Sequence, residues 1–312
     1  MRRALVVGYG SIGARHARIL AEMGSRVACV TRNFDCPYPA FPTLEAGIAH
    51  HAPSHVVVAN ATADHELTLR TLVKMGWDGP ILAEKPLFMR AVNPVDFSAL
   101  KLVTAFNLRF HPLVQQLLER CAGHRLFSAE FHVGQYLPTW RPDQDYRTGY
   151  SASRERGGGV LRDLSHEIDL AQLFCGPFMQ IAALGGHFSD LEIDADDVFH
   201  LLARTEQCPV VSVQMNYLDR VPRRTLCLNG EGFTAVLDFP NGLLDVNGVT
   251  VAAKPERDHT YRGQMRAFLD GDFARLCSLR EALQVDRVVG AAEAAVRNAC
   301  WIDLPPDVLP DC

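Results

Sequence analysis

Short apolar runs alternate with longer segments of helical spacing over the first hundred residues. The apolar runs predict strands at 3–7, 26–30, 55–59, 81–84 and 102–106. Helical spacing follows at 14–23, 44–50 and 64–76. Strands that are apolar on both faces and separated by helices are typical of a doubly wound parallel sheet.

After residue 110 the pattern changes to longer strands in which apolar and polar positions alternate. These strands are expected at 125–133, 198–205, 210–218, 224–228 and 233–239, with late helices at 261–273 and 281–300. Asn-Gly pairs at 229–230, 241–242 and 247–248 are candidate tight turns. The predicted fold class is therefore α/β: a doubly wound parallel-sheet domain at 1–107, then an α+β domain at 108–312 with an open, mostly antiparallel sheet.

The composition is that of a folded globular chain. Of 312 residues, 48% are hydrophobic and 21% are charged, and the net charge is −5. No basic run could neutralise a stretch of phosphates, so we expect no nucleic-acid partner. Only four apolar residues stand before Gly8, which predicts cytoplasmic residence and no membrane partner. The nine cysteines include no Cys-x-x-Cys pair, so we expect neither a disulfide framework nor a metal site.

A glycine turn joins the first strand to the first helix. It consists of Gly8, Tyr9, Gly10, Ser11, Ile12 and Gly13. In such a turn Gly8 makes the tight bend, Gly10 lets the backbone approach a pyrophosphate, and Gly13 allows close packing of helix on strand. The phosphates then lie at the helix N-terminus. The surrounding strand and helix predict a dinucleotide site, with an ordinary tight turn as the alternative.

The end of the second strand bears on the choice of cofactor. NAD-selective sites place an acidic residue about twenty positions after the glycines, whereas this chain has Thr31 and Arg32 there. A hydroxyl and a guanidinium suit a 2′-phosphate, because Arg can bind phosphate through two donors. We therefore expect NADP in preference to NAD. In the alternative, Arg32 is a solvated loop residue and Asp35 reaches the ribose.

Three glycines at 157–159 lead into a segment of helical spacing that runs to Cys175. Its apolar stripe is formed by Leu161, Leu164, Ile168 and Ala171. Asp163, His166 and Asp169 are spaced by three and would share one face, so an acid can fix the tautomer and orientation of the imidazole. A catalytic histidine and a satisfied structural network both fit this spacing.

Four motifs occur in order along the chain: the glycine turn, Glu84-Lys85-Pro86, the segment from Asn107 to Pro112, and the glycine-led segment with His166. Together they resemble the glucose-fructose oxidoreductase and inositol dehydrogenase family (Gfo/Idh/MocA) over most of the chain. The resemblance implies a Rossmann domain followed by an open-sheet domain, and NAD(P)-dependent oxidation or reduction of a sugar or cyclitol hydroxyl. It also implies a homodimer or homotetramer formed through the exposed sheet.

The family's lysine corresponds to Lys85, and its active-site histidine corresponds to His166. Hydride transfer at a secondary alcohol needs a group that takes or supplies the hydroxyl proton, and a cation beside the oxygen. Lys85 and His166 can fill these two roles, and Asp163 is the third expected catalytic residue. The resemblance also implies cofactor contacts from Asn60, Ala61, Thr62, His65, Glu84 and Lys85.

An irregular segment before the glycine-led helix interleaves aromatic residues with arginines. Aromatic faces suit a sugar ring or a base, and arginines suit a carboxylate or a phosphate. The expected substrate-binding residues are Arg109, Tyr136, Trp140, Arg141, Tyr146, Arg147 and Asp169. The segment resembles a branch of the family associated with bacterial surface-sugar and nonulosonic acid pathways, which implies an anionic or nucleotide-linked sugar. A merely structural loop is the alternative.

The sequence thus predicts an enzyme, an NAD(P)-dependent oxidoreductase acting on a CH–OH group of a small-molecule sugar substrate. Two alternatives stay open: a non-catalytic NADP-binding regulator, and an enzyme whose permanently bound cofactor supports epimerisation or glycoside cleavage. The presence of both Lys85 and His166 counts against the regulator, since a sensor needs neither residue.

Overall fold

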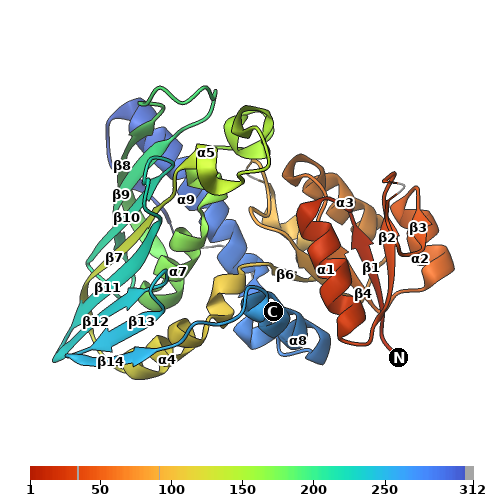
Figure 1. Cartoon of the computed structure of the whole chain (residues 1–312), viewed down its shortest axis with the longest axis horizontal. Helices are drawn as coiled ribbons and strands as arrows, with labels where there is room; N and C mark the ends of the chain where they lie inside the picture. The colour runs from red at the N-terminus through yellow and green to blue at the C-terminus, as the bar shows by residue number, and fades with distance from the viewer. Residues whose placement is uncertain (34, 91, 306–312) are drawn as a thin grey trace. The chain divides into compact units, whose positions relative to one another are not determined.

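The computed structural model describes residues 1–33, 35–90 and 92–305, and the chain divides into two compact units. The first unit comprises Met1–Phe110 and Arg257–Leu283, and the second comprises His111–Glu256 and the described residues from Gln284 onward. Figure 1 labels their elements along the chain. Within these residues, no helix has the length and apolarity that a membrane span requires.

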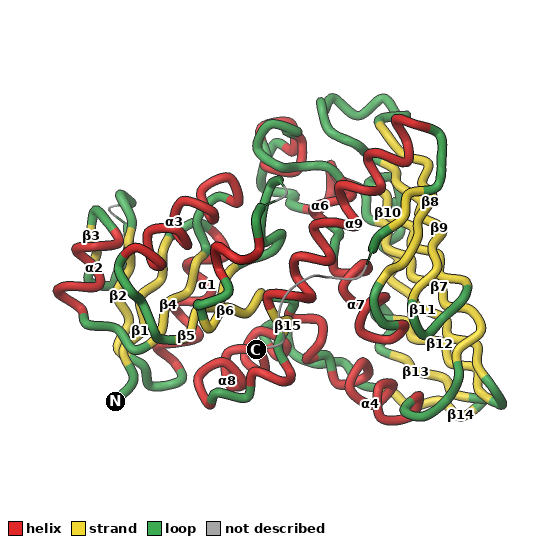
Figure 2. Tube along the Cα trace, turned by 180° about the vertical axis from the view of Figure 1, so that it is seen from behind, coloured by secondary structure: helices red, strands yellow, loops and turns green. Residues whose placement is uncertain are grey.

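A seven-stranded sheet forms the centre of the first unit, with the strand order β15-β6-β5-β4-β1-β2-β3. Its pairs are parallel except for that of β15 with β6, and its strands lie side by side in Figure 2. The strands are β1 (Arg3–Val7), β2 (Arg26–Val30), β3 (Ala40–Phe41), β4 (His55–Val58), β5 (Pro80–Ala83), β6 (Lys101–Thr104) and β15 (Cys277–Ser278). The helices are α1 (Ser11–Glu22), α2 (Leu44–His51), α3 (Thr62–Lys74) and α8 (His259–Asp270), with shorter turns η1 (Pro94–Phe97), η2 (Asn107–Phe110) and η5 (Phe273–Arg275).

The inner strands of this sheet are buried on both faces. Leu5, Val57 and Leu82 have no exposed surface, which explains the continuous apolar runs in the sequence. β1 lies between β4 and β2, so the strand order reverses beside it and the residues after β1 stand at this switch point. The parallel sheet expected from the sequence is confirmed.

The division between the units differs from the single boundary after residue 107 that the sequence predicts. The chain crosses at residue 110, and the segment 257–283 then returns to the first unit. The reason is packing, because Met265 and Phe268 of α8 are fully buried in the core of that unit.

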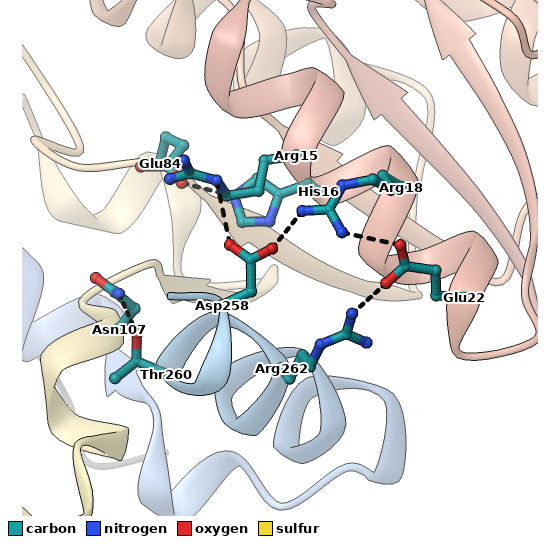
Figure 3. A network of polar contacts seen from close by, with 9 residues as sticks. All are labelled: Arg15, His16, Arg18, Glu22, Glu84, Asn107, Asp258, Thr260 and Arg262. Carbon is teal, nitrogen blue, oxygen red and sulfur yellow. Dashed lines mark hydrogen bonds and ion pairs between the residues drawn. The ribbon is translucent and has the colours of Figure 1, made fainter. Parts of the chain in front are cut away.

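Ion pairs also attach α8 to α1 (Figure 3). Asp258 lies 3.5 Å from Arg15 and also pairs with Arg18. Glu22 continues the network, because its two carboxylate oxygens pair with Arg18 and with Arg262 of α8.

A nine-stranded sheet forms the centre of the second unit, with the strand order β14-β13-β12-β11-β7-β10-β9-β8-β16. β10 pairs with β7 in parallel and the remaining pairs are antiparallel, which confirms the expected fold class. The strands are β7 (Leu126–Gly134), β8 (Phe178–Gly186), β9 (Val198–Thr205), β10 (Val210–Asn216), β11 (Arg223–Gly230), β12 (Phe233–Asp238), β13 (Leu243–Val246), β14 (Val249–Ala252) and β16 (Ile302–Asp303). The helical elements are α4 (Pro112–Cys121), α5 (Leu137–Trp140), η3 (Tyr146–Thr148), η4 (Tyr150–Ala152), α6 (Val160–Asp163), α7 (His166–Cys175) and α9 (Leu279–Asn298), which begins in the first unit.

Two of the three expected Asn-Gly turns form. The pairs at 241–242 and 247–248 join β12 to β13 and β13 to β14. The prediction at 229–230 is wrong, because both residues belong to β11 and the chain turns at 231–232 instead. Gly232 has a φ of 66° and supplies the left-handed conformation there.

Candidate functional site

The glycine turn lies at the carboxyl end of β1 and leads into the N-terminus of α1. Gly8 has a φ of +95°, and a Cβ there would lie 2.5 Å from the backbone nitrogen of Asn60. A Cβ at Gly13 would lie 2.1 Å from the carbonyl oxygen of Gly8. Both positions therefore require glycine for reasons internal to the protein.

Gly10 differs from these two glycines. Its φ of −80° and ψ of −169° suit any residue, and none of the described atoms beyond its chain neighbours lies within 4 Å of a Cβ built there. Packing gives no reason for a glycine at this position, whereas the close approach of a ligand does. Gly10 is also the N-cap of α1 and has no side chain that could accept from the first N–H groups. These N–H groups can bind phosphate, so the turn fits the pyrophosphate of a dinucleotide.

The remaining turn residues present different groups. The Tyr9 ring packs edge-on against Tyr38, with 6.3 Å between the ring centroids. Ile12 packs against the hydrophobic core, and Ser11 is exposed at the start of α1. Backbone groups of Tyr9 and Ile12, and the Ser11 hydroxyl, are therefore the parts that could contact a ligand.

Asn60 follows β4 and touches the glycine turn. Its Nδ2 donates to Thr68 Oγ1 at 2.9 Å, and its buried Oδ1 has no hydrogen-bond partner among the described residues. Such an acceptor is suited to a donor on a bound molecule. Ala61 is exposed, whereas Thr62, the first residue of α3, is buried.

The position of His65 does not support the expected direct contact with a cofactor. The side chain has no exposed surface, and its Nδ1 and Nε2 lie 3.1 Å and 3.3 Å from the carbonyl oxygens of Leu87 and Asn60. Burial lowers the pKa of His65 below its usual value of 6.5. A neutral imidazole has one N–H and can donate to only one of these carbonyls, and the Leu87 carbonyl is the nearer of the two.

Thr31 and Arg32 follow β2. The Thr31 N–H donates to the carbonyl oxygen of Phe41 at 3.0 Å, and Thr31 Oγ1 accepts from the Asn33 N–H at 2.9 Å. The exposed Arg32 forms no ion pair with any of the described residues. Its guanidinium can therefore bind an external anion.

Glu84 and Lys85 follow β5. Glu84 Oε1 lies 2.6 Å from Nε2 of the fully buried His16, and Glu84 Oε2 accepts from the Lys85 N–H at 3.3 Å. Lys85 is half-buried. The carboxyl ends of β1, β2, β4 and β5 lie at one edge of their parallel sheet, so Glu84 and Lys85 complete the candidate dinucleotide site of the first unit.

Asp163 and His166 belong to two helices of the second unit. α6 ends at Asp163 and α7 begins at His166, so the prediction of one continuous helix is wrong and the chain breaks at 164–165. Asp163 Oδ2 accepts from the Tyr217 hydroxyl at 2.9 Å and also from Ser151 Oγ. Two hydroxyl donors therefore fix the position of this oxygen.

Two residues expected to bind substrate are buried within their units. Asp169 of α7 has no exposed surface. Arg109 is 3% exposed and lies 2.9 Å from Glu281 Oε1 and 3.3 Å from the carbonyl oxygen of Leu276. Both positions favour structural roles.

Part of the aromatic and arginine segment lines a shallow hollow in the second unit. Its lining consists of Leu137, Trp140, Arg141, Gln144, Asp145, Tyr146 and Gly149. Trp140 also packs against Tyr217, with 6.0 Å between the ring centroids. The hollow therefore adjoins the residue that holds Asp163.

Tyr136 and Arg147 lie outside the lining of this hollow. The Tyr136 ring is covered by the guanidinium of Arg220 at 4.1 Å from its centroid. Arg147 is paired with Asp145 at 2.9 Å and with Glu192 at 2.8 Å. Arg147 therefore already has two carboxylate partners within the protein.

Sequence reasoning missed three residues that contact the candidate groups: His16, Ser151 and Tyr217. Their partners lie 68, 12 and 54 positions away along the chain, so no local spacing relates them. One signal exists for His16, which shares the buried face of α1 with Leu20 and is a polar residue on an apolar stripe.

Comparison with known families supplies independent information on the second unit. A family model for the GFO/IDH/MocA C-terminal domain matches residues 113–236. Residues 113–236 therefore form a GFO/IDH/MocA C-terminal domain. The resemblance inferred from the four motifs is confirmed. Comparison with curated proteins finds no match.

Solved structures match the chain over nearly its whole length. GenD2 from gentamicin A biosynthesis, in complex with NAD, is 20% identical, covers 98% of this chain and 97% of its own, and has a TM-score of 0.81. WlbA dehydrogenase from Bordetella pertussis, with NADH and UDP-GlcNAcA, is 19% identical, covers 98% and 99%, and has a TM-score of 0.77. Levoglucosan dehydrogenase with NADH is 19% identical, covers 97% and 99%, and has a TM-score of 0.81. At these identities the matches establish the fold.

Proposed function

We propose that the protein is an NAD(P)-dependent oxidoreductase that transfers a hydride between nicotinamide and a secondary hydroxyl or keto group of a sugar or sugar derivative. The observation that carries the proposal is Gly10, a glycine that packing does not require, at the N-terminus of α1 and at the switch point of a parallel sheet. Lys85 follows another strand end at the same edge of that sheet.

The nicotinamide, when bound, accepts or donates the hydride. In the proposed reaction the Lys85 ammonium stabilises negative charge on the substrate oxygen, and His166 takes or returns the hydroxyl proton. The hydroxyls of Ser151 and Tyr217 hold the Asp163 carboxylate in place.

The proposed cofactor preference is NADP over NAD. The support is Arg32, an exposed guanidinium without an ion pair among the described residues, at the end of the strand that precedes the ribose position. The solved structures named above contain NAD or NADH, so Arg32 is the residue on which this part of the proposal depends.

The proposed substrate is an anionic or nucleotide-linked sugar. Trp140 and Tyr146 offer aromatic faces for a ring, and the exposed Arg141 offers a cation for a carboxylate or phosphate in the same hollow. WlbA, a structure of the same fold, holds UDP-GlcNAcA.

The test measures reduced nicotinamide formed from NADP⁺ or NAD⁺ with UDP-GlcNAcA, levoglucosan and myo-inositol as trial substrates. Lys85→Ala is expected to lower kcat by about 10² to 10⁴. Unchanged turnover in Lys85→Ala would remove this residue from catalysis. Tight dinucleotide binding without turnover of any trial substrate would favour a non-catalytic NADP-binding regulator.

A further inference from the structure

His16 is a buried histidine of the first unit that the proposed reaction does not use. Its side chain has no exposed surface, and its Nε2 lies 2.6 Å from Glu84 Oε1 (Figure 3). Glu84 Oε2 accepts from the backbone N–H of Lys85 at 3.3 Å. One carboxylate therefore connects an enclosed imidazole to the residue that carries the proposed catalytic amine.

The direction of the His16 hydrogen bond follows from its surroundings. Its Nδ1 is buried and has no hydrogen-bond partner among the described residues. A carboxylate oxygen accepts hydrogen bonds, and Glu84 Oε1 is the atom that faces Nε2. His16 therefore donates its Nε2–H to Glu84.

The ring of His16 is fixed from the other side by α8. Tyr261 packs edge-on against it, with 6.1 Å between ring centroids and an interplanar angle of 68°. Arg15 lies over the Tyr261 ring at 4.8 Å and 3.5 Å from Asp258. The segment that returns to the first unit thus supports the orientation of His16.

His65 holds the same segment on the far side of Pro86. Its Nδ1 lies 3.1 Å from the carbonyl oxygen of Leu87, and its Nε2 lies 3.3 Å from that of Asn60. Lys85 therefore stands in a short stretch of chain that is tied to α1 before it and to α3 after it.

We propose that His16 and His65 are positioning residues for Lys85. They act through Glu84 and through the Leu87 carbonyl, and neither is assigned contact with substrate or with the reacting atoms. The proposal rests on the proposed function only for the role of Lys85; the positioning itself can be measured in the protein without cofactor.

The measurement is competitive acetylation of the apoprotein with trace acetic anhydride between pH 7 and pH 10, read by mass spectrometry. The chain has four lysines, Lys74, Lys85, Lys101 and Lys254. Lys74 and Lys101 are exposed on the first unit, whereas Lys85 is half-buried. The ratio of Lys85 to Lys74 labelling therefore reports how the surroundings of the Lys85 amine affect its reactivity, and Lys101 is an internal reference.

Four variants of the two histidines make the test specific. His16→Phe and His65→Leu remove the donors, and we expect each to change the Lys85 to Lys74 ratio by about threefold or more, because a hydrogen bond that fixes the segment is lost. His16→Gln can still donate from its amide at the position of Nε2, and His65→Asn can still donate at the position of Nδ1. Both conservative variants should keep the wild-type ratio and its pH profile.

His55→Gln is the matched control. His55 is partly buried in the same unit and packs edge-on against Phe268, with 5.3 Å between the ring centroids. It is the first residue of β4, so it lies at the amino ends of the parallel strands, away from the carboxyl ends that Glu84 and Lys85 follow. The His55→Gln variant should leave the Lys85 to Lys74 labelling ratio unchanged. An unchanged ratio in His16→Phe and His65→Leu, or an equal change in His55→Gln or in the conservative variants, would overturn the proposal.

Turnover adds a second readout. His16→Phe should lower kcat by about 10- to 100-fold, because small displacements of a catalytic group have effects of that size, while KM stays within a small factor. Failure of the proposed function appears separately, as Lys85→Ala without effect on turnover. The labelling result is independent of that outcome, since it requires neither substrate nor cofactor.

Discussion

Two alanine substitutions in the glycine turn separate packing from ligand binding. In Gly13→Ala the new Cβ would lie 2.1 Å from the carbonyl oxygen of Gly8. Because this oxygen is a backbone atom, it cannot rotate out of the way as a side chain can. In Gly10→Ala the new Cβ meets no described atom within 4 Å beyond its chain neighbours, and the backbone already has a conformation open to alanine.

The expected magnitudes follow from these geometries. Overpacking a tight site costs about 1–3 kcal/mol, and the backbone clash places Gly13→Ala near the upper end. At about 2–4 °C per kcal/mol for a unit of this size, the melting temperature should fall by roughly 6–12 °C. Gly10→Ala should leave it unchanged or raise it slightly, since alanine restricts the unfolded chain by about 0.4–1 kcal/mol.

Dinucleotide affinity should respond to Gly10→Ala. A Cβ in the path of the pyrophosphate removes close contact with the N–H groups of α1, and a hydrogen bond to a charged group contributes about 1.5–3 kcal/mol. That loss corresponds to an increase in Kd of about 10- to 100-fold. No comparable loss is expected from an ordinary tight turn that binds nothing.

The assay combines thermal unfolding with titration of NADPH and NADH into both variants and the wild type. Lys74→Ala, at the exposed last residue of α3 and outside the glycine turn, is the control that should change neither stability nor dinucleotide affinity. Wild-type affinity in Gly10→Ala would refute the assignment of the turn to the pyrophosphate. A Gly13→Ala variant with wild-type stability would refute the packing argument.

Three further predictions concern the rest of the chain. Tyr217→Phe keeps the volume but removes the hydroxyl that donates to Asp163 Oδ2, so kcat should fall about tenfold. The free energy of unfolding in urea should stay within about 1 kcal/mol of wild type, and an unaltered kcat would contradict this role. Asp258→Ala should lower stability by about 1 kcal/mol or less, because the ion pairs are partly exposed, and the difference should vanish at 1 M salt, where charges are screened within about 3 Å. Burial lowers the pKa of His65 below 6.5, so the unfolded state binds more protons than the folded state. The free energy of unfolding should therefore fall as the pH drops below about 6.5. His65→Asn should flatten that slope, and a pH profile identical to wild type in this variant would count against burial as the cause.

Strands with strict patterning were predicted well from the sequence. β9 alternates buried and exposed side chains along its length, and its observed bounds equal the expected range of 198–205. β8 was not predicted, because its second half, Ala182–Gly186, is rich in small residues and alternates weakly. The hydrogen bonds to β9 determine its conformation instead.

The helix with His166 shows the limit of periodicity. An apolar stripe continues from Leu161 to Ala171, and every residue of the stripe is buried. Periodicity reports the buried face, which is the same for one helix and for two short ones. The break at 164–165 was therefore invisible in the pattern.

The glycine turn and Lys85 could be proposed from the sequence because their motifs consist of adjacent residues. The contacts of Arg109 and His65 and the burial of Asp169 could not be predicted, because each depends on elements that come together only in the fold. The return of 257–283 to the first unit has the same cause, since the buried face of α8 does not say which core it joins.

The central claim is that the first unit binds a dinucleotide whose 2′-phosphate meets Arg32. It is tested most directly by titrating NADPH and NADH into the wild type and Arg32→Ala, followed by nicotinamide fluorescence. The account predicts saturable binding of both dinucleotides, with NADPH about tenfold tighter in the wild type and the difference lost in Arg32→Ala, as expected for one charge-assisted contact. Equal affinities in both proteins would remove the NADP preference, and saturable binding of neither dinucleotide would contradict the account.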